Sequence, residues 1–327
     1  MSESDQFDEI LRSLTAAHHI LIFSHLGPDG DAVGSALGLW WLLREQGKEV
    51  EVSFADPLPF NFRFLPGVEL VTDRPLAGHD LVVALDGSDA ERYGANFLTA
   101  RASGTPLVTI DHHKTNTCFG DLNWVDSQFA ATAQMIYHLA RQAGWPLSAE
   151  AAFCLATGCV TDTNAFSTDH TTPTLLENVA DLMREGAPLS QIIRQTMSLR
   201  SQADAALWGR ILSTQHVERG VAWAMSSIAD RKAVGASEED GSGISTFLCN
   251  ILGVKIGILF TEVDPETVRL SIRSRPLYDV GTLALDLGGG GHTQASGATL
   301  TMALEEAIQL VIPRAQALVQ EKVALIP

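Results

Sequence analysis

The chain lacks paired cysteines and an excess of basic residues. None of its four cysteines stands in a C-x-x-C pair, so we expect reduced thiols rather than a zinc or redox site. Lys and Arg number 22 against 39 Asp and Glu, which gives a formal net charge of −17. Such an acidic chain is a poor binder of long nucleic acid, which needs a basic surface. A short anionic substrate held by metal ions and a few arginines remains compatible with this charge.

Long hydrophobic runs and a targeting segment are also missing. The longest apolar run, Ala36 to Leu43, is too short to cross a bilayer. Residues 1–14 have neither the basic start nor the apolar stretch of a signal peptide. We therefore expect a cytoplasmic protein with no membrane partner. Apolar residues make up 46% of the 327 positions, which is enough for the cores of two domains.

The first half of the chain alternates strand and helix patterns. Strands are predicted at residues 19–25, 48–54, 80–86 and 106–113, and helices at 32–46, 127–143, 148–160 and 173–186. Continuous apolar strands that alternate with helices are typical of an α/β domain with a doubly wound, mainly parallel sheet. We assign this domain to residues 1–186, followed by a polar helical linker at 187–216.

Beyond residue 217 the pattern changes. Strands are predicted at 221–226, 254–260 and 267–274, a loop at 234–243, and a long helix at 303–322. This predicts a second, smaller α/β or α+β domain over residues 217–327.

Three predicted strands of the first domain end in residues that can bind metal. In chain order they end in His25, in Asp86 and in the triplet Asp111-His112-His113. In an open parallel sheet, ligands bind beyond the carboxyl ends of the strands. Polar residues placed there by chance would not all be Asp and His. The sequence therefore predicts a metal site at this edge of the sheet.

The first of these strand ends is followed by two acidic residues, Asp29 and Asp31, in a glycine-containing loop. A turn with a helix cap explains one such carboxylate equally well. Gly30 and Gly34 also suit a phosphate-binding loop at a helix start. Two carboxylates would repel a phosphate unless a cation lay between them, so a metal pocket that includes His25 is the better interpretation.

One further carboxylate, Asp162, follows a helix too apolar for the surface, where a buried charge needs a partner such as a metal. The candidate ligands are then His25, Asp29, Asp31, Asp86, His112 and Asp162. These are more ligands than one tetrahedral zinc uses, and no cysteine is among them. Mixed His and Asp ligation suits two Mn²⁺ ions, with Mg²⁺, Co²⁺ or Fe²⁺ as alternatives.

At these residues the chain resembles the DHH phosphoesterase family. Its name-giving triplet is Asp111-His112-His113, and its other motifs match the loop from His25 to Ser35, the isolated Asp86 and the run Thr161-Asp162-Thr163. The glycine run before His292 resembles the signature of the DHHA1 domain. The compact two-domain size is similar to the nanoRNase/pAp phosphatase (NrnA-type) branch. Asn164 departs from the pattern, since we expect a glycine there.

The resemblance implies a role for each residue of the site. One metal would take His25, Asp29 and Asp86, and the other would take Asp31, Asp86, His112 and Asp162. Asp86 would then bridge the two ions. Asp111 would support the site without binding metal, and His113 would face the scissile phosphate. The resemblance therefore implies that Asp86, Asp111 and His113 are the catalytic residues.

The second domain carries the residues expected to hold the substrate. Arg273, near the end of an alternating strand, belongs either to a solvated edge or to a bidentate phosphate clamp. The run Gly288 to Gly291 alone suits a flexible loop, but followed by His292 it suits a backbone that closely approaches a ligand. The resemblance implies a substrate-binding set of Arg273, Ser274, Gly290, Gly291 and His292.

We expect an enzyme, a two-metal phosphoesterase that uses Mn²⁺. Its substrates would be short oligoribonucleotides, 3′-phosphoadenosine 5′-phosphate (pAp), or both, cut to mononucleotides. A phosphodiesterase for cyclic or linear dinucleotides is the first alternative. A pyrophosphate or polyphosphate hydrolase and a catalytically inactive nucleotide sensor are the others. The partner is then a short RNA or nucleotide and not long nucleic acid, and a homodimer is compatible with the sequence.

Overall fold

The chain folds into two compact units, unit 1 (Met1–Leu199) and unit 2 (Arg200–Pro327). The computed structural model describes residues 3–73, 77–237 and 240–323. Residues 238–239, part of the loop expected at 234–243, therefore lie outside the described residues. None of the described helices is long and apolar enough to cross a membrane.

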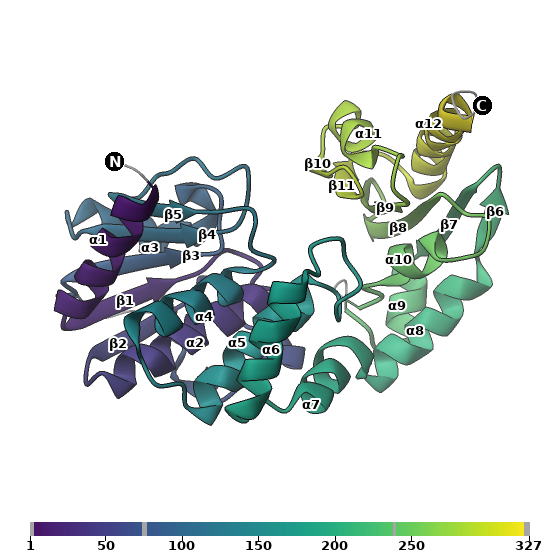
Figure 1. Cartoon of the computed structure of the whole chain (residues 1–327). Helices are drawn as coiled ribbons and strands as arrows, with labels where there is room; N and C mark the ends of the chain where they lie inside the picture. The colour runs from purple at the N-terminus through teal and green to yellow at the C-terminus, as the bar shows by residue number, and fades with distance from the viewer. Residues whose placement is uncertain (1–2, 74–76, 238–239, 324–327) are drawn as a thin grey trace. The chain divides into compact units, whose positions relative to one another are not determined.

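Unit 1 is built on a five-stranded parallel sheet with the strand order β2-β1-β3-β4-β5 (Figure 1). The strands are β1 (His19–Phe23), β2 (Glu49–Ser53), β3 (Leu81–Leu85), β4 (Leu107–Asp111) and β5 (Leu122–Val125). Every residue of β3 and β4 is buried, as expected for strands covered on both faces. The predicted parallel sheet is confirmed. The half-buried edge strand β5 was not predicted.

Helices cover both faces of this sheet. The α-helices of unit 1 are α1 (Glu3–Ala16), α2 (Gly30–Glu45), α3 (Gly94–Ala102), α4 (Thr132–Ala143), α5 (Ala149–Asp162), α6 (Pro173–Arg184) and α7 (Leu189–Ile193). On one face, α2 and α4 form the main core with Ile20 and Ile22 of β1. On the other, Phe97 of α3 packs edge-on against Phe23. α5 packs on α2 and α4, with α6 and α7 beyond it.

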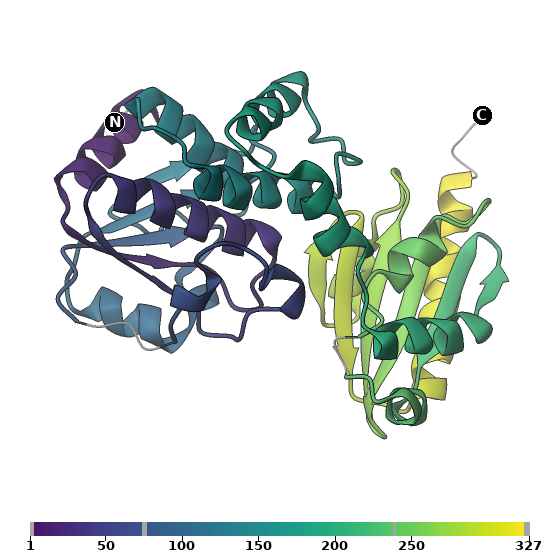
Figure 2. The same ribbon diagram turned by 90° about the horizontal axis from the view of Figure 1, so that it is seen from below.

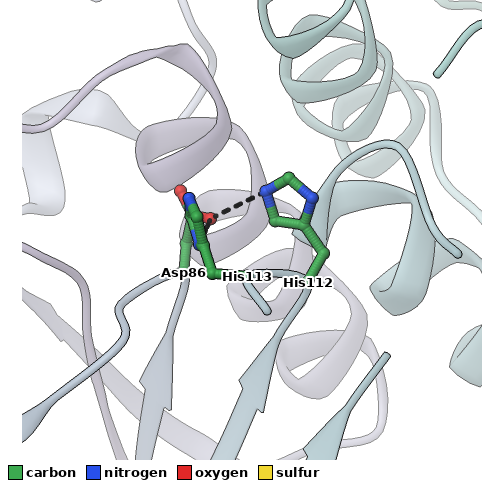
Figure 3. A group of neighbouring side chains, drawn as sticks. All are labelled: Asp86, His112 and His113. Atoms are coloured by element: carbon green, nitrogen blue, oxygen red, sulfur yellow. Dashed lines mark ion pairs between the residues drawn. The ribbon is translucent and has the colours of Figure 1, made fainter. Parts of the chain in front are cut away.

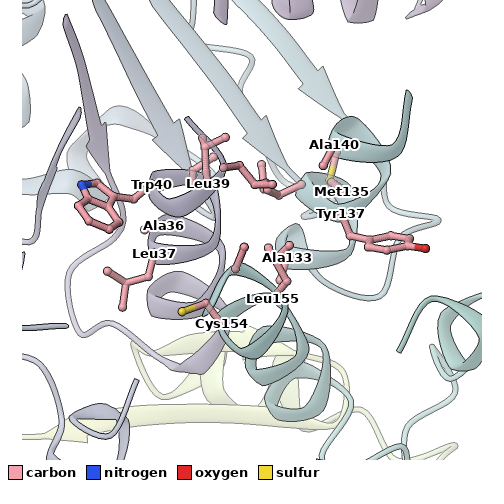
Figure 4. Packing of buried hydrophobic residues seen from close by; sticks show 14 of the residues in the cluster. Ala36, Leu37, Leu39, Trp40, Ala133, Met135, Tyr137, Ala140, Cys154 and Leu155 are labelled. Carbon is pink, nitrogen blue, oxygen red and sulfur yellow. The ribbon is translucent and has the colours of Figure 1, made fainter. Parts of the chain in front are cut away.

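The interface between α2 and α5 depends on glycine, because the two helices approach closely. A β-carbon on Gly34 would lie 2.6 Å from the carbonyl oxygen of Cys154. A β-carbon on Gly158 would lie 2.5 Å from Asp31 Oδ1 and 2.5 Å from Ala133 Cβ. Figure 4 shows the apolar side chains of α2, α4 and α5 that meet around this contact. The close packing brings the end of α5 to the start of α2.

Unit 2 is built on a six-stranded mixed sheet with the strand order β10-β11-β9-β8-β7-β6 (Figure 2). The strands are β6 (His216–Glu218), β7 (Val221–Ser226), β8 (Ile256–Asp264), β9 (Thr267–Ser274), β10 (Gly290–His292) and β11 (Ala295–Leu300). Only β7 and β8 pair in parallel. Gly290 and Gly291 of the glycine run belong to β10, so this part of the run is a strand and not the loop that the glycines alone suggested.

Helices also cover both faces of the unit 2 sheet. They are α8 (Gln202–Ser213), α9 (Ile228–Val234), α10 (Ile244–Cys249), α11 (Val280–Asp286) and α12 (Leu304–Val323). α11 and α12 form one core with Ile256, Leu270 and Ile272, while α8 and α10 form another with Leu259. The short helices α9 to α11 were not predicted.

The stretch expected as a linker, 187–216, is divided between the two units. Its first part, α7, packs on α5 of unit 1, and its larger helix, α8, packs on α9 and β7 of unit 2. The compact units therefore divide at Leu199 and Arg200, within the expected linker.

Candidate active site

The carboxyl ends of three parallel strands place ligand-type residues at one edge of the unit 1 sheet. His25 lies two residues after β1, Asp86 directly follows β3, and Asp111 is the last residue of β4. Asp29 caps the start of α2 by accepting the N–H groups of residues 31 and 32, both at 3.0 Å. Asp162 ends α5. All six predicted metal ligands fall into groups whose ligand atoms lie within 4.8 Å of one another.

The first group consists of His25, Asp29 and Asp86. His25 Nε2 lies 3.8 Å from Asp29 Oδ1 and 3.6 Å from Asp86 Oδ2. The other ring nitrogen, Nδ1, lies 2.8 Å from the carbonyl oxygen of Leu26. In the neutral imidazole that carbonyl holds the proton on Nδ1 and leaves the Nε2 lone pair directed at the carboxylates.

The second group consists of Asp31, His112 and Asp162. His112 Nε2 lies 3.1 Å from Asp162 Oδ2, 4.0 Å from Asp31 Oδ2 and 3.6 Å from Asp86 Oδ1. Figure 3 shows the ring of His112 turned toward Asp86. This Nε2 is buried and has no hydrogen-bond partner. Donor atoms that share one ion at about 2.1 Å lie about 3–4 Å apart, so both groups fit a cation.

Asp86 lies between the two groups: it belongs to the first, and it forms a third with His112 and His113. Its two oxygens face different histidines. Oδ2 faces His25 and Oδ1 faces His112. Its backbone has φ +61°, in the left-handed region that non-glycine residues seldom adopt. Thr132 Oγ1 donates a hydrogen bond to Oδ1 at 3.0 Å and fixes the buried carboxylate. Residues held in this backbone region cluster at functional sites.

Asp31 is fully buried and is held by the first turn of α4. Its carboxylate accepts the N–H of Thr132 at 2.6 Å and of Ala133 at 2.9 Å. Even so, burial raises the pKa of Asp31 well above its usual range, and the charges of Asp86 and Asp162 raise it further. The helix-capping role considered from the sequence thus falls to Asp29 for α2, while Asp31 caps α4.

The carboxylates around His25 and His112 raise the pKa of both imidazole rings. Burial lowers the pKa of His25, but Asp29 and Asp86 outweigh it and raise that pKa to about 10. Burial likewise opposes protonation of His112, but Asp162 and the neighbouring carboxylates raise its pKa to about 10. Without a cation, protons must balance these carboxylates. A divalent cation would replace those protons and be bound by His112 Nε2 together with the carboxylates.

Asp111 pairs with His113. One of its oxygens, Oδ1, lies 2.7 Å from His113 Nδ1 and accepts the His113 N–H at 3.2 Å. The other, Oδ2, accepts a hydrogen bond from the Asn116 amide at 2.6 Å. Hydrogen bonding to Asp111 raises the pKa of His113. Asn116 and Thr132 were not assigned from the sequence, although Asn116 stands in the same loop as the DHH triplet.

Asn164 adopts a backbone conformation that suits glycine. Its φ is +46°, the first of three consecutive positive values at residues 164–166. Asparagine tolerates this region better than most side chains. The departure from the expected glycine therefore leaves the turn after Asp162 intact.

Unit 2 places two of the predicted substrate residues, Arg273 and His292, in one row across its sheet. His292 pairs with Ala295, which pairs with Arg273, which pairs with Gly257. Directly paired residues share a face of the sheet, and α10 covers that face at Gly257, where a β-carbon would lie 2.3 Å from the carbonyl oxygen of Ser245. Ser274 lies outside the row, because side chains alternate along a strand and its hydroxyl donates to the carbonyl of Tyr278 at 2.6 Å.

Arg273 is half-buried and has no carboxylate partner among the described residues. Its Nη1 donates to the carbonyl oxygen of Ile272 at 3.0 Å. Burial lowers the pKa of the guanidinium, the direction expected for a cation without a counter-ion. Such a group fits a phosphate or carboxylate of a ligand.

Unit 1 carries ligand-type side chains at the strand ends of a parallel sheet, and unit 2 carries a half-buried arginine on a second sheet. These features define a class of enzyme: a hydrolase of phosphoester bonds. Family models agree with this assignment: residues 19–159 match the DHH family, N-terminal domain, and residues 220–321 match the DHHA1 domain. The chain belongs to the DHH family.

Relatives with curated names support the same assignment. The chain is 35% identical over 311 residues to the bifunctional oligoribonuclease and PAP phosphatase NrnA of Thermus thermophilus, covering 93% of this chain and 90% of the relative. It is 30% identical over 297 residues to the protein of the same name from Bacillus subtilis, covering 89% of this chain and 92% of that relative. A crystal structure of an exopolyphosphatase-related protein from Bacteroides fragilis has a TM-score of 0.89 at 25% identity, covering 96% of both chains.

Proposed function

We propose that this protein hydrolyses short oligoribonucleotides and pAp to mononucleotides, with two divalent cations bound in unit 1. The named activities of the relatives from T. thermophilus and B. subtilis support the substrate class. Both relatives are matched over about nine-tenths of their length, so the similarity includes both units.

The position of Asp86 between two histidine–carboxylate groups is the observation that carries the proposal. One ion would be held by His25, Asp29 and Asp86, and the other by Asp31, Asp86, His112 and Asp162. A set of oxygen and imidazole donors without thiolate is typical of a Mn²⁺ site rather than of a structural zinc site. Two divalent ions bound together lower the pKa of bound water and stabilise the charge that develops on a phosphoryl group.

His113 has the hydrogen bonding of a general acid. Its Nδ1 is engaged by Asp111 Oδ1, which leaves Nε2 as the nitrogen that can give a proton to another molecule. The hydrogen bond to Asp111 raises the pKa of His113 and so favours the protonated ring. The proposed role is donation of this proton from Nε2 to the leaving oxygen of the substrate.

Arg273 supplies the proposed contact to a non-scissile phosphate. A guanidinium that is half-buried and lacks a carboxylate partner binds a phosphate strongly, because little water must be removed and no internal ion pair must break. His292 in the same row is the second proposed substrate residue. A β-carbon on Gly290 would meet nothing within 4 Å, so its proposed role is to let a ligand approach closely. A β-carbon on Gly291 would lie 2.6 Å from the carbonyl oxygen of Ala295, so the proposed role of that glycine is to let β10 pair closely with β11.

A second candidate function has one specific observation in its favour. The structural relative from B. fragilis is named as exopolyphosphatase-related. A polyphosphate chain would also satisfy Arg273, but it has no base or sugar. Cyclic or linear dinucleotides and an inactive nucleotide-binding role are the remaining alternatives; the complete set of ligand-type residues argues against the inactive role.

A turnover panel tests the proposal. The purified protein, loaded with Mn²⁺, is assayed on pAp, a dinucleotide RNA, a 20-mer RNA, cyclic di-AMP and tripolyphosphate. We expect the highest kcat/KM for pAp or the dinucleotide, and a lower value for the 20-mer. Preference for tripolyphosphate, or a steady rise of kcat/KM with RNA length, would contradict the proposal.

A further inference from the structure

Two turns in unit 2 share a backbone conformation but differ in the residue that adopts it. In the turn at 251–254, the N–H of the fourth residue donates to the carbonyl of the first at 3.1 Å, and the third residue is Gly253 with φ +86°. In the turn at 275–278, the corresponding hydrogen bond is 3.3 Å, and the third residue is Leu277 with φ +83°. Turns with this φ favour glycine or asparagine at that position.

Leu277 has a strained backbone conformation, and its side chain packs little against the rest of unit 2. A side chain with a β-carbon is disfavoured at positive φ, and glycine would remove that cost. The leucine side chain is 70% exposed, so it contributes little to the core of unit 2. An exposed apolar residue in a strained conformation points to a functional role more than to a structural one.

The turn that carries Leu277 is hydrogen-bonded to the residues next to Arg273 and His292. Directly after Arg273, the Ser274 hydroxyl donates to the carbonyl of the fourth turn residue, Tyr278, at 2.6 Å. On the other side, the Val280 N–H donates to the carbonyl oxygen of Thr293, the residue after His292, at 2.9 Å. The turn with Leu277 is therefore held beside the end of β9, which carries Arg273, and beside the end of β10, which carries His292.

We propose that Leu277 is a specificity-determining residue that packs against the nucleobase or ribose of the substrate whose phosphate Arg273 binds. This inference rests on the proposed function. The chemistry of the two side chains is complementary to a nucleotide, which joins an anionic phosphate to a sugar and a base with an apolar face. A polyphosphate offers nothing for Leu277 to contact. The residue would thus select nucleotides over simple phosphates.

The central test is the variant Leu277→Gly, assayed with pAp under Mn²⁺. We expect KM to rise about tenfold with kcat unchanged, since a leucine that becomes partly buried when substrate binds contributes on the order of one decade to affinity. We also expect a melting temperature equal to or above that of the wild type, because glycine removes the strain at φ +83°. A side chain with only a structural role would lower the melting temperature instead.

Three further measurements separate side-chain contact from turn flexibility. Leu277→Ala keeps the strained backbone and should raise KM similarly without a gain in melting temperature. Leu277→Met keeps an apolar side chain of similar size and should retain wild-type KM. Leu252→Ala, which truncates a 99% exposed leucine in the matching turn, should change nothing. Inhibition by inorganic phosphate, which lacks a base, should be equal in all of these variants.

The outcomes distinguish this inference from the proposed function. If the wild type hydrolyses pAp and Leu277→Gly has the same KM, the inference is wrong and the proposed function stands. It is also wrong if Leu277→Gly loses melting temperature and phosphate inhibition together, because the residue then only supports the fold. If the wild type turns over neither pAp nor a dinucleotide, the proposed function fails and the inference fails with it.

Discussion

Unit 1 and unit 2 each hold charge of the kind that binds a ligand of opposite charge, but the sign and the construction differ between them. In unit 1, buried carboxylates from distant parts of the chain, such as Asp31 and Asp86, are forced together at the edge of a parallel sheet. In unit 2, a single half-buried guanidinium, Arg273, stands in a row of paired strands among small residues. The first arrangement calls for cations, and the second calls for an anion.

The comparison shows how one enzyme can separate chemistry from recognition. The carboxylates of unit 1 are held by backbone N–H groups and by Thr132, so their geometry is set before any ligand binds. The guanidinium of unit 2 bonds only to its neighbour's carbonyl among the described contacts, so under the proposed function a bound phosphate would supply most of its partners. Variants in the two units should therefore fail in different ways.

The largest effect is expected for Asp86→Asn. Loss of the shared carboxylate weakens both proposed ion positions, and we expect kcat/KM for pAp to fall by about a thousandfold or more. The fold should persist, because the amide oxygen still accepts from Thr132 and one repelling charge is gone. Circular dichroism, metal content and turnover are compared with the control variant Asp126→Asn, which should stay active. Asp126 follows β5, and among the described contacts its side chain accepts only the Gln128 N–H. Equal activity of the two variants would refute the role of Asp86.

Arg273→Ala should impair recognition and spare the metals. Removing one charge-assisted phosphate contact costs about 1.5–3 kcal/mol, or roughly ten- to a hundredfold in kcat/KM for pAp. Most of the loss should appear in KM, while Mn²⁺ content stays at the wild-type level. The exposed Arg314 on α12 offers a control, since Arg314→Ala removes the same charge far from the row in sequence. Loss of Mn²⁺ in Arg273→Ala would mean that the arginine belongs to the metal site.

The contact between α2 and α5 offers a structural way to damage unit 1 alone. In Gly158→Ala the new methyl group would lie 2.5 Å from Asp31 Oδ1, so we expect a loss of about 1–3 kcal/mol in unfolding free energy and weaker Mn²⁺ binding. Gly209→Ala, in α8 of unit 2, meets open space and should be neutral or slightly stabilising. Denaturant melts and metal titrations of both variants check this. Wild-type Mn²⁺ affinity in Gly158→Ala would show that the helix contact does not position Asp31.

The strand-end residues could be predicted from the sequence because each follows an apolar run directly. His25, Asp86 and the triplet from Asp111 stand where parallel strands must end together, and the structure brings them to one edge. The tertiary contacts could not be predicted. That Thr132 donates to Asp86 depends on how α4 packs, which no local pattern records.

In unit 2 the sequence was less informative. The exclusion of Ser274 from the row of Arg273 follows from strand alternation and could have been derived, since adjacent residues point to opposite faces. The glycine run concealed β10, because glycine is weak in strands and signals loops. The positive φ of Leu277 had no sequence signal at all, because leucine is not a turn residue.

A graded effect on metal affinity is expected from pH. Without metal, the raised pKa values of His25 and His112, both about 10, keep the two rings protonated at pH 7. Mn²⁺ must displace these protons, so its affinity should rise with pH toward 10, by about tenfold per pH unit for each proton released. Isothermal titration between pH 6.5 and 8 in buffers of different ionisation enthalpy measures the release. Flat affinity and buffer-independent heat would contradict the assignment of both histidines as ligands.

The most direct test of the account is the number of Mn²⁺ ions that one chain binds. Metal-stripped protein is titrated with Mn²⁺, and bound metal per chain is counted after removal of free ions, for the wild type and for Asp86→Asn. The position of Asp86 between two groups predicts two ions per wild-type chain and a loss of tight binding at both positions in the variant. A single tight ion in the wild type, or two ions retained by the variant, would contradict the proposed shared site.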